Sequence, residues 1–164
     1  MSLAADTATV TEYYEADHDT LDGYFMAFHV LKRTNWMNAK ESFEAFRVGL
    51  QRHILWEEQI LFPFWERKTG LWDMGPTTVM RTDHRQIRNL LDSIHAKVQQ
   101  DDPNSEAEEQ ELLVVLSAHN TKEERVLYPA IDQMATEEER RRIFMDMASL
   151  PKEWFASCCE TEHA

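Results

Sequence analysis

Apolar residues recur along the chain at intervals of three and four, which is the spacing of one face of an α-helix. The longest stretches of this pattern predict four helices, over residues 11–33, 38–68, 77–100 and 105–134. A shorter fifth helix is predicted to carry Ile143, Phe144 and Met147. Val/Ile-rich runs typical of strands are absent, and glycine and proline fall mostly between the helices. We therefore expect an all-α fold, an antiparallel up-down-up-down four-helix bundle with a short fifth helix towards the C-terminus.

Local signals refine the predicted helices. Ser105 with Glu108, and Thr136 with Glu139, have the spacing of capping boxes, in which the first side chain accepts a hydrogen bond at the helix N-terminus. Pro63 lies inside the second helical pattern, where a missing N–H group disturbs the backbone. We expect the helix to kink or tighten there.

Two copies of one motif stand out on the second and fourth predicted helices. Residues 53–63 and 119–129 both read His-x-x-x-Glu-Glu-x-x-Leu-aromatic-Pro. On a helix, residues four apart are separated by about 40° and about 6 Å, so each histidine and its first glutamate share a face. Burying a carboxylate without a partner is costly. Two such pairs on facing helices indicate that the partner is a metal.

The sequence offset between the two motif copies recurs elsewhere in the chain. Six of the seven histidines form three pairs at this same offset, His18 with His84, His29 with His95 and His53 with His119. The simplest explanation is a duplicated helical hairpin packed against its twin about a pseudo-twofold axis. Each hairpin then brings one histidine from its first helix and a His–Glu pair from its second. The predicted metal ligands are His18, His53, Glu57, His84, His119 and Glu123.

This set of donors suits two metal ions. If both carboxylates bridge, each ion receives two imidazoles and two carboxylate oxygens, and a bridging oxide or hydroxide leaves one octahedral position open. Mixed nitrogen and oxygen ligands without thiolate favour Fe or Mn and tolerate Zn. The alternative is a duplication that kept six buried polar groups without metal, which then need other hydrogen-bond partners.

Several other polar residues near these positions have two readings. His29 and His95 lie about 16 Å along the helix from His18 and His84, so they are satisfied histidines near the bundle end or, less simply, a gate or proton path. Four carboxylates adjacent to predicted ligands are exposed charges or hydrogen-bond partners of the imidazoles. These are Asp17, Glu58, Asp83 and Glu124.

Composition narrows the functional class. The net charge of −13 argues against a nucleic-acid partner, and no stretch approaches the roughly 20 apolar residues of a membrane span. The N-terminus has neither a basic nor an apolar run, so we expect no signal peptide and a cytoplasmic protein. Cys158 and Cys159 are adjacent and read as an inert pair, with a redox role as the alternative. We expect a single domain over residues 1–164, with the bundle at about 11–134.

The histidines and the two motifs resemble the hemerythrin-like HHE cation-binding domains over about residues 12 to 134. The resemblance implies a four-helix bundle around a non-haem di-iron centre, bridged by the two carboxylates and an oxo or hydroxo group. Oxygen-carrying hemerythrins have a fifth histidine where this chain has Arg88, and an aspartate where it has Glu123. The four-histidine, two-glutamate set is more similar to di-iron proteins that repair iron–sulphur centres. Members of that group usually carry an N-terminal cysteine-bearing domain, whereas the helical pattern here begins near residue 11.

We therefore expect a di-iron protein that interacts with O₂, NO or peroxide, in stress response, sensing or iron-centre repair. One alternative is a reversible O₂-binding or storage protein, and another is an interaction module that metal only stabilises. The expected partner is a diatomic ligand or peroxide, with no nucleic acid and no membrane. The sequence leaves open whether the protein turns over a substrate and which oligomer it forms.

Overall fold

The computed structural model describes residues 8–156, and every regular element in this range is helical. Four long helices form the bundle, α1 (Val10–Leu31), α2 (Trp36–Trp56), α4 (Pro76–Gln99) and α5 (Glu106–Lys122). The second and fourth are each continued by a π-helical turn and a short α-helix. These are η1 (Glu57–Leu61) with α3 (Phe62–Thr69), and η2 (Glu123–Leu127) with α6 (Tyr128–Met134). Two further helices follow, α7 (Glu137–Ser149) and α8 (Glu153–Ala156).

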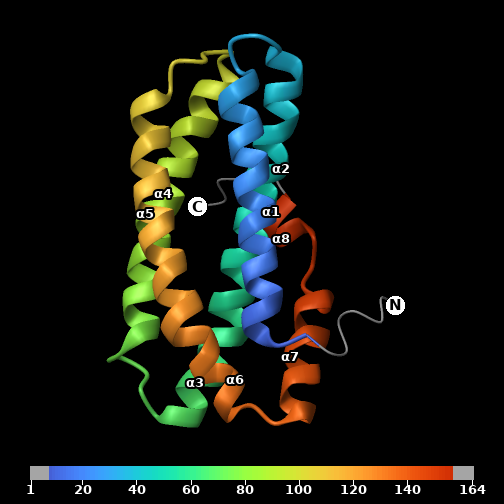
Figure 1. Cartoon of the computed structure of the whole chain (residues 1–164), viewed down its shortest axis with the longest axis vertical. Coiled ribbons are helices and arrows are strands. Elements are labelled where there is room, and N and C mark those ends of the chain that lie inside the picture. The colour runs from blue at the N-terminus through green and yellow to red at the C-terminus, as the bar shows by residue number, and fades with distance from the viewer. Residues whose placement is uncertain (1–7, 157–164) are drawn as a thin grey trace.

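The long helices pair as two hairpins that pack against each other. Helix α1 packs along α2, and α4 packs along α5, with short connections between them (Figure 1). The predicted all-α four-helix bundle is therefore confirmed. Helix α7, which carries the predicted fifth apolar stripe, packs beside η1, and the unpredicted helix α8 packs against α2.

One of the two predicted capping boxes is correct and the other is wrong. At the start of α7, Thr136 accepts from the Glu139 N–H and the Glu139 side chain accepts from the Thr136 N–H. The Ser105 side chain makes no cap at the start of α5. Its hydroxyl instead donates to Glu109 Oε2 at 2.7 Å, because Glu109 is buried and needs hydrogen-bond donors.

The prolines at the ends of the motifs widen the helix instead of tightening it. Phe62 N–H donates to the Glu57 carbonyl, and Tyr128 N–H donates to the Glu123 carbonyl, five residues back in each case. Proline has no N–H, and its ring clashes with the carbonyl four residues earlier in an α-helix. A π-helical turn relieves this conflict, and such turns are frequent at functional sites. Both turns begin at a predicted ligand, Glu57 or Glu123.

The core consists of two apolar clusters separated by a polar layer. One cluster fills the end of the bundle nearest the α1–α2 connection and includes Phe28, Phe43, Leu91 and Leu112. The other lies under α3, α6 and α7 and includes Trp56, Phe62, Leu127, Ile131 and Ile143. The polar layer between them contains the predicted ligands. None of the described helices combines the length and apolar character needed to cross a membrane.

Candidate metal centre

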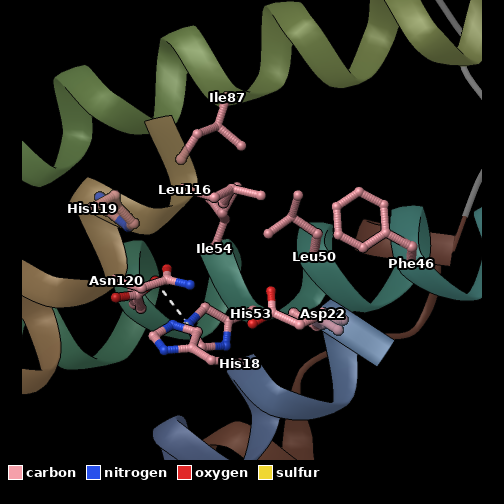
Figure 2. Close-up of a pocket in the computed structure, with 12 residues that line it drawn as sticks. His18, Asp22, Phe46, Leu50, His53, Ile54, Ile87, Leu116, His119 and Asn120 are labelled. Atoms are coloured by element: carbon pink, nitrogen blue, oxygen red, sulfur yellow. Dashed lines mark hydrogen bonds and ion pairs between the residues drawn. The ribbon is translucent and has the colours of Figure 1, made fainter. Parts of the chain in front are cut away.

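Six buried polar side chains from the four long segments of the bundle converge between the two apolar clusters. They are the six predicted ligands, His18 on α1, His53 on α2, Glu57 in η1, His84 on α4, His119 on α5 and Glu123 in η2. Glu57, His84 and Glu123 are completely buried. The imidazoles of His18 and His53 lie side by side, with their Nε2 atoms 3.0 Å apart (Figure 2).

Each glutamate contacts imidazoles from both hairpins. Glu57 Oε1 lies 3.2 Å from His53 Nε2 and 3.5 Å from His84 Nε2. Glu123 Oε1 lies 3.1 Å from His119 Nε2 and 3.5 Å from His18 Nε2. Both carboxylates therefore lie between the two halves of the bundle, as bridging ligands would.

The convergent atoms lack the hydrogen bonds that buried polar atoms normally have. Glu57 Oε1, both carboxylate oxygens of Glu123 and His84 Nε2 are buried without a hydrogen-bond partner among residues 8–156. A buried polar atom without any partner costs about 1–3 kcal/mol, and in the metal-free protein only the imidazole contacts at 3.1–3.5 Å offset that cost. Donor atoms of Glu57, His84, His119 and Glu123 lie within 4.8 Å of one another, as do those of His18, His53 and Glu123. This nitrogen and oxygen donor set fits one or two metal ions.

A second set of carboxylates orients the four imidazoles. Each imidazole Nδ1 hydrogen-bonds to a carboxylate contributed by a different helical segment, which directs Nε2 towards the centre. The pairs are His18 with Glu124 at 2.9 Å, His53 with Asp17 at 2.8 Å, His84 with Glu58 at 2.9 Å and His119 with Asp83 at 3.0 Å. Such contacts fix the tautomer and the ring orientation of metal-binding histidines. Of the two readings that the sequence left open for these carboxylates, the structure supports hydrogen bonding.

Basic side chains hold three of these outer carboxylates. The contacts are Arg52 to Asp17 at 3.5 Å, Arg88 to Glu58 at 3.0 Å and Lys122 to Asp83 at 2.6 Å. Arg88 therefore holds Glu58, the carboxylate that hydrogen-bonds to His84. Six carboxylates against three basic side chains leave the centre negative, which favours cations.

Electrostatics divides the four imidazoles into two pairs. Burial lowers the pKa of His53, but Glu57 and Asp17 outweigh it and raise this pKa to about 9. Burial also lowers the pKa of His84, but hydrogen bonds to Glu57 and Glu58 outweigh it, so that this pKa is raised. Burial is the largest cause that lowers the pKa of His119 to about 4, and it also lowers the pKa of His18. Metal binding at pH 7 would therefore displace a proton from His53 and meet His119 already neutral.

Tyr128 is a polar group of the centre that sequence reasoning missed. Its hydroxyl donates to Glu57 Oε2 at 3.1 Å and lies 3.3 Å from His53 Nε2. Burial and then the charge of Glu57 raise the pKa of Tyr128 well above its ordinary value. The first motif has Phe62 at the equivalent position, where its ring stacks on His84 with centroids 5.5 Å apart. The difference between Phe62 and Tyr128 in the two motif copies could have indicated this hydroxyl from the sequence.

A small cavity borders the centre on its apolar side (Figure 2). Its volume of about 10 Å³ gives room for roughly one water-sized sphere. The walls combine His18, His53, Glu57 and His119 with apolar side chains such as Ile54. A wider groove between α1 and α5 shares four residues with it, His18, Asp22, Leu116 and Asn120.

The remaining histidine predictions lie outside this cluster. His29 Nδ1 hydrogen-bonds to Glu109 at 2.9 Å, and the His29 side chain is half exposed. His95 stacks on Phe43 with ring centroids 6.1 Å apart. Both belong to the end of the bundle away from the π-helical turns, as satisfied histidines do. Cys158 and Cys159 lie outside the described residues.

Comparison with known proteins gives one match. The family model of the hemerythrin HHE cation-binding domain matches residues 9–131, which contain all four histidines and both glutamates of the cluster. No curated protein and no solved structure matches the chain.

Proposed function

The chain belongs to the hemerythrin HHE cation-binding domain family, and on this premise we propose that its six-residue centre holds two iron ions. We propose further that this di-iron centre binds a small ligand, O₂, NO or peroxide, in stress response, sensing or iron-centre repair. The family supports metal binding in general, and the donor geometry supports the number of ions. A di-iron centre supplies redox chemistry and an open coordination position.

The observation that carries the proposal is the position of the two glutamates. Each has an oxygen between imidazoles of opposite hairpins. Among residues 8–156, three of their four oxygens have no hydrogen-bond partner, and the fourth accepts from Tyr128. A single metal would satisfy one half of the bundle and leave the other half unsatisfied. Two ions bridged by both carboxylates satisfy all four imidazoles.

The surroundings of the centre suit a small ligand rather than a large substrate. The adjoining cavity of about 10 Å³ has room for roughly one water-sized sphere beside His18, His53, Glu57 and His119. Its apolar side chains exclude bulk water, while His18 and Asp22 also face the wider groove. The outer carboxylates thus orient the four imidazoles through their Nδ1 atoms, and the small cavity adjoins the same donor cluster.

The test is anaerobic purification from iron-fed cells, with iron content and visible spectra recorded before and after addition of O₂ or NO. We expect two irons per chain and a spectral change with both gases. An oxygenated form that persists for minutes would indicate reversible O₂ binding, and rapid one-way oxidation would indicate turnover or sensing. A centre that gives no spectral response would contradict ligand binding and leave a metal that only stabilises the bundle.

A double variant tests the residues. His119→Ala with Glu123→Ala should abolish the two-iron stoichiometry, because it removes an imidazole and a bridging carboxylate. His29→Ala is the matched control, since His29 lies outside the cluster and should leave the iron content unchanged. Unchanged iron content in the double variant would rule out the site.

A further inference from the structure

The hydroxyl of Tyr128 lies among the donor atoms of one hairpin. Tyr128 is completely buried, and its oxygen lies 3.1 Å from Glu57 Oε2, 3.3 Å from His53 Nε2 and 3.5 Å from His18 Nε2. The two Nε2 atoms are themselves 3.0 Å apart. The phenol oxygen therefore lies within 3.5 Å of two imidazole nitrogens and one carboxylate oxygen that belong to predicted metal ligands.

These separations match the edges of a metal coordination polyhedron. Two donors bonded at right angles to one ion, each at about 2.1 Å, are separated by about 3 Å. A phenol hydroxyl donates one hydrogen bond and can accept others, so hydrogen bonds account for these contacts in the metal-free protein. A metal bound at this place would replace all three contacts at once.

We propose that Tyr128 is an additional protein ligand of the metal held by His18 and His53, bound through its oxygen as a tyrosinate. This assignment rests on the proposed di-iron centre. In the structure the phenolic proton is donated to Glu57, and ligation releases that proton to solvent, because metal ligands bind in their deprotonated form.

The assignment makes the two metal positions unequal. Tyr128 would give the metal held by His18 and His53 a protein ligand that the metal held by His84 and His119 would lack, because the equivalent residue on that side is Phe62. The small cavity is lined by His18 and His53 as well as by His119, so it adjoins both metal positions.

Spectroscopy of the iron-loaded protein tests the assignment directly. Tyrosinate bound to ferric iron gives a charge-transfer band in the visible and resonance-enhanced phenolate ring vibrations, which histidine and carboxylate ligands do not give. We expect both signals in the oxidised wild-type protein. Tyr128→Phe should lower the intensity of the charge-transfer band at least tenfold. It should also weaken the binding of one of the two irons by roughly 10–100-fold.

Tyr14→Phe is the matched control. Tyr14 is also fully buried, its ring centroid lies 4.9 Å from that of Tyr128, and its hydroxyl donates to Met147 Sδ instead of the centre. This variant loses one buried phenol hydroxyl and should keep the band. If Tyr128→Phe fails to fold, the band in wild type and its survival in Tyr14→Phe still carry the assignment.

The outcomes separate this inference from the proposed function. Wild-type protein with two irons and no phenolate vibrations would overturn tyrosinate ligation and leave the di-iron centre intact, with Tyr128 only a hydrogen-bond donor to Glu57. A band that persists unchanged in folded Tyr128→Phe would also overturn it. Protein that binds no iron would overturn both.

Discussion

Replacement of Asp83 by asparagine isolates the contribution of an outer carboxylate to metal binding. Asp83 Oδ2 accepts from His119 Nδ1 at 3.0 Å and from Lys122 Nζ at 2.6 Å. The pKa of His119 is lowered to about 4, mainly by burial, so this imidazole is neutral at pH 7 and carries its single proton on Nδ1. Its Nε2 lone pair is then available at 3.1 Å from Glu123 Oε1.

Asparagine keeps the shape of this contact and removes its charge. Its amide oxygen in the position of Oδ2 can accept from both Lys122 and His119, but a neutral acceptor forms weaker hydrogen bonds than a carboxylate does. The His119 imidazole then loses the charged partner that orients it and raises its basicity as a metal ligand. Loss of such a contact lowers metal affinity by roughly 10–100-fold, or about 1.4–2.7 kcal/mol.

The assay compares metal-loaded and metal-free samples. Metal-binding free energy adds to folding free energy, so the loaded variant should unfold roughly 3–11 °C lower than loaded wild type, at about 2–4 °C per kcal/mol. The metal-free variant should change less, because without metal it loses only the charge of a partly exposed hydrogen-bond acceptor. Anaerobic competition for Fe(II) gives the affinity itself.

Asp92→Asn is the matched control for Asp83→Asn. Asp92 lies on the same helix and is exposed, so the same loss of charge should leave metal affinity unchanged. Equal decreases in melting temperature with and without metal, together with unchanged affinity, would refute the argument that the Asp83 carboxylate strengthens His119 as a metal ligand. A similar loss of affinity in Asp92→Asn would reduce it to an effect of net charge.

Three further predictions concern stability. A Cβ added at Gly49 would lie 2.5 Å from Leu21 Cδ2, so Gly49→Ala should lower the free energy of unfolding by about 1–2 kcal/mol, although alanine has the better helix propensity. A Cβ added at Gly23 would meet no atom within 4 Å, so Gly23→Ala should raise the free energy of unfolding by about 0.5–1 kcal/mol. Denaturant titration checks both, and an undiminished stability of Gly49→Ala would show that the Leu21 side chain moves aside at little cost. Hydrogen bonds from Arg81 lower the pKa of buried Glu66 below its ordinary 4.5 against the effect of burial, so this pair stabilises the fold above pH 4.5 and loses its effect as the pH falls below it. Glu66→Gln should therefore lower the free energy of unfolding by about 1.5–3 kcal/mol at pH 7, and the difference from wild type should shrink at acidic pH. A difference that does not depend on pH would contradict an ion pair between Glu66 and Arg81.

The sequence predicts the contents of the centre well because helix geometry is regular. A spacing of four places His53 above Glu57 on any helix, and the internal repeat supplies the same pair again as His119 and Glu123 in the second hairpin. The grouping of the six side chains then needs only that two similar hairpins pack face to face. The structure brings all of them together in one buried layer.

The contacts around the centre depend on quantities that periodicity does not contain. Asp17 is adjacent to His18 in sequence, but its carboxylate binds His53, because the rotation of α1 against α2 places it there. Proline at the end of a motif indicates a disturbed helix, yet a kink and a π-helical turn both relieve its clash. The widened turn changes the rotation of everything that follows it, so the position of the Tyr128 hydroxyl could not be read from the motif.

Departures from the internal repeat explain why the two faces of the centre differ. The offset that pairs His18 with His84 also equates Asp22 on α1 with Arg88 on α4. Arg88 pairs with Glu58 at 3.0 Å and thereby covers the outer side of His84 with an ion pair. Asp22 cannot form such a pair with Glu124, since both are carboxylates, and it lines both the cavity and the groove between α1 and α5. A duplicated hairpin therefore supplies the symmetrical donors. Arg88 covers the centre beside His84, whereas its equivalent Asp22 leaves the side beside His18 open to the groove.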